Sequence, residues 1–263
     1  DGYAPAYAAA VTASSATIGL MIPPSIPMVV FALFTPADVA DLFIAGIVPG
    51  LLMGLFLLVA SVVMAVRRGY PAAQWEGMGR LWRALRRSIW ALLMPVLVIA
   101  GMLSGVATVN EIGALAAVYA LFVSLVIYRD VAPRSLLAAC IEAAKDSAKI
   151  LIIIAASGAF VWIAARVGLS TQLAGFVSGL DIGPVAVLAL IAVLLLVLGT
   201  VLEPVTLLVV VAPVLAPVAI LAGIDVVQLG VVFILASSIG LVTPPVGILL
   251  FVTSAQADVP LTK

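Results

Sequence analysis

Long apolar runs divide this 263-residue chain and restrict the kind of fold that it can adopt. Apolar residues make up 65% of it and charged residues only 9%, whereas a soluble domain is about a quarter charged. A helix needs about 20 apolar residues to cross the hydrocarbon core of a bilayer. We therefore expect an all-α polytopic membrane protein embedded in a lipid bilayer. The apolar runs cover residues 4–34, 42–66, 88–107, 112–128, 150–166, 183–222 and 226–252.

Basic residues gather in two polar stretches, which sets the expected orientation. Short loops rich in Lys and Arg stay on the cytoplasmic side, and the two runs between these stretches cross the membrane and return. We expect residues 35–149 to hold membrane spans with two cytoplasmic amphipathic helices, at 80–89 and 135–149; solvated loop helices are the open alternative. The basic residues of the two stretches are Arg67, Arg68, Arg80, Arg83, Arg86 and Arg87, then Arg129, Arg134, Lys145 and Lys149.

Missing residue types exclude several chemistries. The chain has no histidine, which removes the usual general base and metal ligand. Its one cysteine, Cys140, rules out an intramolecular disulfide and a Cys-based zinc site. The chain has no Gly-x-Gly-Asp motif, which intramembrane aspartyl proteases carry. It therefore lacks the catalytic residues expected of an intramembrane enzyme. The 12 basic and 12 acidic residues balance, and nothing indicates a nucleic-acid partner.

A short motif occurs twice and is the most informative feature. Ile-Gly-Leu-x-x-Pro-Pro stands at 18–24 and again at 239–245, each copy preceded by a Ser-Ser pair. The expected topology runs the two copies in opposite directions, which is the pattern of inverted-topology repeats in secondary transporters. We interpret 1–34 as a broken helix that ends a first repeat, and 150–263 as a second repeat whose broken helix is 226–252. Simple proline kinks are the alternative.

A second polar interruption lies inside the run 183–222. Two apolar arms flank Gly199-Thr200-Val201-Leu202-Glu203-Pro204, a sequence that breaks a helix. Non-helical backbone at membrane depth is tolerated only inside protein or against a water-filled cavity. We therefore favour a re-entrant hairpin over two full spans. Glu203 is expected to shape this turn or an ion site, and Glu111 either to serve a site or to satisfy amides at a helix start.

Gly46, Gly50 and Gly54 recur every fourth residue in the run 42–66. This small-xxx-small spacing predicts a helix-packing face.

The two broken helices suggest oxygen-based ion chemistry. Consecutive prolines remove amide donors and expose carbonyls near Ile22 and Thr243. Carbonyl and hydroxyl oxygens are hard ligands that suit Na⁺ and no transition metal, and each new half-helix N-terminus can face an anion. The expected cation-binding residues are Ser15, Thr17, Ile22, Pro23, Ser25, Gly199, Thr200, Thr243, Pro244 and Gly247. The expected substrate-facing residues are Pro24, Ser25, Pro245, Val246 and Gly247.

At these residues the chain resembles the large membrane (permease) subunit of tripartite ATP-independent periplasmic (TRAP) transporters. The resemblance spans essentially the whole sequence, and the Pro-Pro-Ser and Thr-Pro-Pro-Val-Gly pair is its most specific part. The stretches that carry it are Gly2-Tyr3, 8–27, 45–50, 67–71, Ser104-Gly105, Ala212-Pro213, Ala216-Pro217, 223–225 and 243–247.

The resemblance implies a Na⁺-driven importer of the ion-transporter superfamily that works by an elevator-type motion. In that family a periplasmic binding protein delivers an organic acid, a small membrane subunit braces the large one, and re-entrant hairpins and broken helices hold ion and substrate. It implies a multi-pass protein of a bacterial or archaeal inner membrane, with Na⁺ as coupling ion and no cofactor.

Two departures from the family pattern keep a carboxylate: Asn110-Glu111 stands for Thr-Glu, and Glu203-Pro204 for Asp-Pro. The family's first hairpin precedes Gly2-Tyr3 and a last apolar segment follows Lys263, so we expect a chain truncated at both ends. Two other functions stay open: a stand-alone Na⁺/dicarboxylate symporter or anion exporter of the same architecture, and a non-transporting membrane scaffold.

Overall fold

The computed structural model describes residues 2–71, 77–129 and 131–259, and every regular element within those ranges is helical. Five helical stretches of the described residues are long and apolar enough to cross a membrane: Val39–Arg67, Met78–Leu103, Val109–Tyr128, Arg134–Val167 and Pro204–Leu221. The chain is thus a polytopic α-helical membrane protein. The helices are α1 (Pro5–Ala16), α2 (Ile26–Phe34), α3 (Val39–Arg67), α4 (Met78–Leu103), α5 (Val109–Phe122), α6 (Pro133–Val167), α7 (Leu169–Gly179), α8 (Pro184–Gly199), α9 (Pro204–Leu221), α10 (Val226–Gly240) and α11 (Ile248–Ala257).

Two compact units make up the fold. The first consists of residues 1–71 together with 150–263, and the second of residues 72–149. Lys263, after which the resemblance places a further apolar segment, lies outside the described residues.

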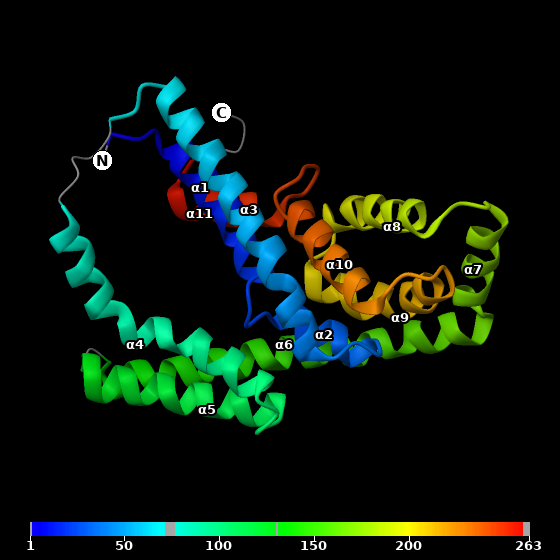
Figure 1. Cartoon of the computed structure of the whole chain (residues 1–263), viewed down its shortest axis with the longest axis horizontal. Coiled ribbons are helices and arrows are strands. Elements are labelled where there is room, and N and C mark those ends of the chain that lie inside the picture. Colours follow the sequence, from blue (N-terminus) through cyan, green and yellow to red (C-terminus); the bar gives the residue numbers. More distant parts are fainter. Residues whose placement is uncertain (1, 72–76, 130, 260–263) are drawn as a thin grey trace. The chain divides into compact units, whose positions relative to one another are not determined.

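Helix α9 lies among other helices of the first unit, next to α10 (Figure 1). It is apolar on all sides, as expected of a helix surrounded by protein, and most of its side chains are buried. Helices α2, α7, α8 and α10 all pack against it. Leu207, Leu208 and Val209 are fully enclosed, and Pro213 and Pro217 lie inside the helix.

Both Pro-Pro motifs interrupt a helix, as the sequence predicted. After α1 the chain passes through a short 3₁₀ turn, η1 (Thr17–Leu20), and residues 21–25 are non-helical before α2 begins. Between α10 and α11 residues 241–247 are likewise non-helical. The physical reason is that Pro23, Pro24, Pro244 and Pro245 have no N–H to donate to the preceding turn. We call 21–25 the first break and 241–247 the second break.

The predicted turn at Gly199–Pro204 is also present. Helix α8 ends at Gly199, α9 begins at Pro204, and the two helices pack against each other. Pro184 and Pro204 occupy first helical positions, where the missing N–H costs nothing.

Gly46 and Gly50 of α3 pack against the first break, as their spacing predicted, whereas a Cβ on Gly54 would meet only Ile18 Cδ1, at 3.7 Å. A Cβ on Gly46 would lie 2.3 Å from Met28 Cε and 2.9 Å from the carbonyl oxygen of Met21. On Gly50 it would lie 2.8 Å from Ile22 Cγ1. Only glycine lets the two backbones approach this closely.

The second unit contains α4, α5 and the π-helical segment η2 (Val123–Tyr128). Two tyrosines join α4 to the following elements: the Tyr119 hydroxyl donates to the Trp90 carbonyl (2.7 Å), and the Tyr128 hydroxyl to the Arg87 carbonyl (2.8 Å). The amphipathic segment 80–89 is continuous with the apolar run that follows it, in the single helix α4. The segment 135–149 likewise continues without interruption into 150–166, in α6. Charges on one face of a helix do not break it, so neither segment is a separate element.

Candidate functional site

The first break is enclosed on one side and open on the other. Pro23 and Ser25 are buried, whereas Ile22 and Pro24 are exposed. Within the described part of the chain, no donor hydrogen-bonds the carbonyl oxygens of residues 21–24. The carbonyl oxygens of the exposed residues Ile22 and Pro24 are therefore free of donors from the described residues, whereas the Met21 oxygen packs against Gly46 of α3.

Ser25 starts the half-helix that follows this break. Its hydroxyl donates to the Leu20 carbonyl (2.5 Å) and accepts from the Met28 amide (3.4 Å), so it is the N-cap of α2. Serine is among the preferred N-cap residues because its oxygen satisfies an amide that lacks a helical partner.

The second break is closed by the turn that follows α8. The Gly247 amide donates to the Thr200 carbonyl (3.4 Å), and Gly247 itself has a left-handed backbone with φ of +58°. No hydrogen bond to the carbonyl oxygens of residues 242–246 is found among the residues that the structure describes. Two of the expected cation-binding segments, Gly199-Thr200 and 243–247, thus lie together.

The hydroxyls of the expected site share one arrangement: each donates its proton to a carbonyl three to five residues earlier. The acceptor carbonyls belong to Thr12 for Ser15, Ser14 for Thr17, Leu20 for Ser25, Val197 for Thr200 and Ile239 for Thr243. Each oxygen keeps at least one lone pair for a further partner, although one lone pair of Ser25 already accepts from the Met28 amide. Of the five, Thr17 and Ser25 are buried and Ser15 is exposed on α1.

The two carboxylates singled out in the sequence both cap helices. Glu111 Oε2 accepts from the Thr108 amide (2.7 Å) and hydroxyl (2.8 Å), while the Glu111 amide donates to Thr108 Oγ1 (3.4 Å). This is a capping box at the start of α5. Glu203 Oε2 accepts from the Thr206 amide (3.2 Å) and caps α9. The geometry supports the expectation that Glu203 shapes the turn and that Glu111 satisfies amides at a helix start.

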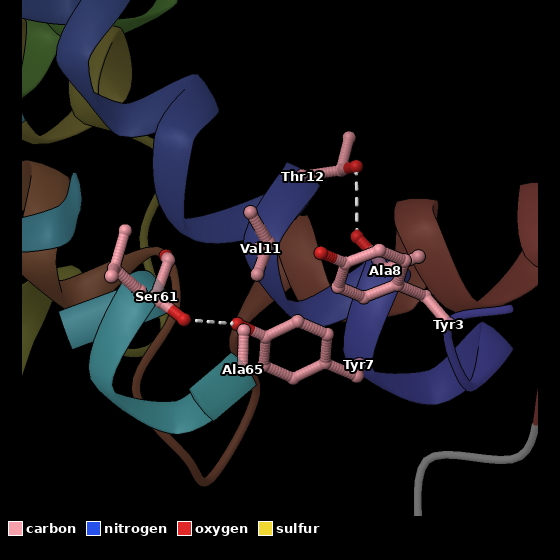
Figure 2. A pocket seen from close by; sticks show the side chains of 8 residues that line it. Tyr3, Tyr7, Ala8, Val11, Thr12, Ser61 and Ala65 are labelled. Atoms are coloured by element: carbon pink, nitrogen blue, oxygen red, sulfur yellow. Dashed lines mark hydrogen bonds between the residues drawn. The ribbon is translucent and has the colours of Figure 1, made fainter. Parts of the chain in front are cut away.

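A separate cavity of about 390 Å³ lies between α1 and α3 (Figure 2). Tyr3 and Tyr7 line it, and the Tyr7 hydroxyl donates to the Ser61 carbonyl (2.6 Å). Tyr70 packs on both tyrosine rings, and the Arg68 guanidinium lies 5.6 Å from the centre of the Tyr7 ring. Sequence reasoning did not single out this cluster, although aromatic residues next to Arg67-Arg68 at the end of a span are typical of a membrane interface.

Comparison with known proteins decides the family. The model of the family described as "Tripartite ATP-independent periplasmic transporter, DctM component" matches residues 1–263. The chain belongs to this family. It is a TRAP transporter permease sequence, which confirms the resemblance drawn from the Pro-Pro motifs.

Several curated relatives of this TRAP permease chain carry named substrates. It is 37% identical, over 99% of its length, to the C4-dicarboxylate TRAP transporter large permease protein DctM of Pseudomonas aeruginosa, and covers 61% of that protein. It is 35% identical to the sialic acid permease SiaM of Vibrio cholerae, covering 97% of this chain and 60% of the relative. It is 37% identical to the 2,3-diketo-L-gulonate permease YiaN of Escherichia coli, covering 95% and 59%.

The chain thus spans about three fifths of the length of these relatives. The relatives are transport permeases and not enzymes, in agreement with the chemistry that the sequence excludes.

The TRAP permease geometry also includes a residue that the sequence argument left without a role. Gly240 belongs to the second Pro-Pro motif, and it lies directly against Gly199 at the end of α8. Gly240 was visible in the sequence as part of the motif, but its contact residue Gly199 stands 41 positions earlier in the chain. The packing role of Gly240 therefore became apparent only from the fold.

Proposed function

We propose that this chain forms the ion- and substrate-handling part of a Na⁺-coupled secondary importer of small organic acids. The protein would lie in the inner membrane of a bacterium and operate by an elevator-type motion. It would act with a small membrane subunit and a periplasmic binding protein that delivers the acid. The substrate class rests on its relatives, which are named for a C4-dicarboxylate, sialic acid and 2,3-diketo-L-gulonate.

One observation carries the proposal: the turn after α8 meets the second break through the bond from the Gly247 amide to the Thr200 carbonyl. Beside that contact, the carbonyls of 242–246 and the hydroxyls of Thr200 and Thr243 present oxygen lone pairs. A cluster of uncharged oxygens suits a hard monovalent cation such as Na⁺, because such cations prefer oxygen ligands and no transition-metal ligand set is needed.

The anion would be held differently. The half-helices α2 and α11 both begin at a break, at Ile26 and Ile248. Their N-termini carry the positive end of the helix dipole, which favours a carboxylate. We propose that the path of the acid, next to the N-termini of α2 and α11, is lined by Pro24, Ser25, Pro245, Val246 and Gly247.

The test is uptake of labelled organic acids by the full-length permease reconstituted with its membrane partner and loaded binding protein. We expect uptake under an inward Na⁺ gradient and none when K⁺ replaces Na⁺ at the same ionic strength. Uptake that is equal in the two salts would contradict Na⁺ coupling. Uptake that needs no binding protein would instead favour a stand-alone symporter.

A matched pair of variants tests the site itself. The Thr243 hydroxyl donates to the Ile239 carbonyl (2.7 Å) in the second break, and the Thr253 hydroxyl donates to the Leu249 carbonyl (2.9 Å) on α11. Thr243→Val and Thr253→Val remove equivalent hydroxyls, and only the first lies in the proposed cation site. We expect Thr243→Val to raise the Na⁺ concentration needed for half-maximal uptake at least about tenfold. Thr253→Val should leave it unchanged.

A further inference from the structure

Helices α8 and α10 cross with no side chain between their backbones. A Cβ built on Gly240 would lie 2.4 Å from the carbonyl carbon of Gly199 and 2.7 Å from both its Cα and its oxygen. A Cβ on Gly199 would lie 3.2 Å from the Cα of Ser237. Because the neighbouring atoms are backbone and not the flexible end of a side chain, a methyl group can be accommodated only if the helices separate.

This crossing stands immediately before both parts of the proposed cation site. Gly199 is the last residue of α8 and precedes Thr200; Gly240 is the last residue of α10 and precedes the second break. Beyond the crossing, the Gly247 amide reaches the Thr200 carbonyl. The turn is therefore held against the break at two points, one a backbone contact and the other a hydrogen bond.

We propose that Gly199 and Gly240 are positioning residues that set the distance between the Thr200 turn and the second break, and so determine the Na⁺ affinity of the permease. This inference rests on the proposed function. An added methyl on Gly240 has to move the end of α8 by about 0.6 Å or more to leave the range under 3.0 Å that real Cβ contacts avoid. A binding constellation works only when its groups are held within about 0.5 Å. Neither glycine has to touch the ion for this effect.

The structure provides a matched control on the same helix. A Cβ on Gly230 would lie 2.6 Å from Leu42 Cδ2 and 2.8 Å from Phe31 Cε1, a conflict of similar size. These neighbours are side-chain atoms of α3 and α2, and Gly230 lies ten residues before the crossing. Gly230→Ala should thus disturb packing without moving the turn after α8.

The experiment compares Gly240→Ala, Gly199→Ala and Gly230→Ala in the full-length permease with its partners. The measurements are the Na⁺ concentration for half-maximal stabilisation and uptake, the KM for the acid, and the melting temperature in the absence of Na⁺. We expect Gly240→Ala to raise the half-maximal Na⁺ concentration at least about tenfold. Gly199→Ala should raise it by a smaller factor, because its closest contact is 3.2 Å and not 2.4 Å. Gly230→Ala should lower the melting temperature and leave the Na⁺ requirement within about twofold of the wild type.

The outcomes separate the inference from the function on which it rests. If neither the thermal stability nor the uptake rate of the wild-type protein depends on Na⁺, the proposed function is overturned. A wild-type protein that responds to Na⁺, with the same Na⁺ requirement in Gly240→Ala and Gly230→Ala, overturns the positioning role alone. If Gly240→Ala does not fold, the milder Gly199→Ala decides, and an unchanged Na⁺ requirement in that variant is equally a refutation.

Discussion

The rings of Phe31 and Phe233 pack with centroids 5.9 Å apart and planes inclined at 58°, and both side chains are completely buried. Phe31 lies on α2, after the first break, and Phe233 lies on α10, before the second break. Gly230, one turn before Phe233, makes room for the Phe31 ring. This aromatic pair therefore packs α2 against α10 in the core of the first unit.

Replacing Phe233 with alanine should destabilise the first unit. A buried Phe→Ala change costs about 3–5 kcal/mol of unfolding free energy in soluble proteins. The interior of a membrane protein is no more apolar than the lipid around it, so the transfer part of this cost is absent and only the lost packing contributes. We expect a loss of about 2 kcal/mol, measured as a lower denaturation midpoint in detergent or bicelles. Phe56→Ala is the control, because Phe56 on α3 is 69% exposed. Equal losses in the two variants would mean that the Phe31–Phe233 contact contributes nothing.

Gly247→Ala should weaken Na⁺ binding beyond its effect on stability. The left-handed backbone at Gly247 disfavours any residue with a Cβ, at a cost of about 1–2 kcal/mol, and relief of that strain would withdraw the amide from the Thr200 carbonyl. We expect at least about a tenfold higher Na⁺ requirement in thermal stabilisation.

Gly223→Ala separates strain from site geometry. Gly223 also has a left-handed backbone, with φ of +78°, and an added Cβ there would meet only Pro184 Cγ at 3.9 Å. The two variants should lose similar stability, and only Gly247→Ala should change the response to Na⁺. A parallel change in Gly223→Ala would show that general destabilisation accounts for the effect.

Glu111→Gln should be nearly silent in both stability and transport. Glutamine serves as well as glutamate at the third helical position of a capping box, and the carboxylate of Glu111 is occupied by the Thr108 amide and hydroxyl. Thr108→Ala, in contrast, should cost about 1 kcal/mol through loss of the N-cap. Both values follow from denaturation midpoints, with uptake measured in parallel. Loss of Na⁺-dependent uptake in Glu111→Gln would assign this carboxylate to the ion path instead.

Glu203→Asp should retain transport and hold α9 at least as firmly. Aspartate is a preferred N-cap residue, and the shorter side chain reaches the same amides. Glu203→Ala removes the acceptor of the Thr206 amide and should cost about 1 kcal/mol. The comparison is made by thermal denaturation and by initial uptake rates. A transport defect in Glu203→Asp would show that side-chain length, and not capping, matters at this turn.

Local chemistry made the helix ends predictable from the sequence. Two consecutive prolines remove two amide donors from one turn, so both breaks follow from Pro23-Pro24 and Pro244-Pro245 without knowledge of the fold. A single proline is a weaker signal, because Pro204 starts α9 whereas Pro213 and Pro217 lie inside it. The spacing of four between the glycines of α3 likewise predicted a packing face, because residues four apart lie on the same side of a helix.

Contacts between distant segments could not be predicted in this way. Nothing around Thr200 in the sequence indicates that its carbonyl meets Gly247, or that Gly199 lies on Gly240, because these contacts depend on how α8 and α10 cross. The same holds for Tyr3, Tyr7 and Tyr70, which meet only because α1 packs beside α3. The segments 80–89 and 135–149 are helical, as expected, but the sequence did not show that each continues into the apolar run that follows it, because polarity changes along α4 and α6 while the backbone hydrogen bonding does not.

The five site hydroxyls have one further consequence. Each hydroxyl donates its only proton to a backbone carbonyl. It can therefore accept a further hydrogen bond or bind a cation, but it has no proton left to donate. A carboxylate oxygen, which brings only lone pairs, would be repelled there, whereas a metal ion, a water proton or an ammonium group would be accepted. We therefore expect an organic anion to bind at the backbone amides of the half-helices, that of Ser25 included, and not at these hydroxyls.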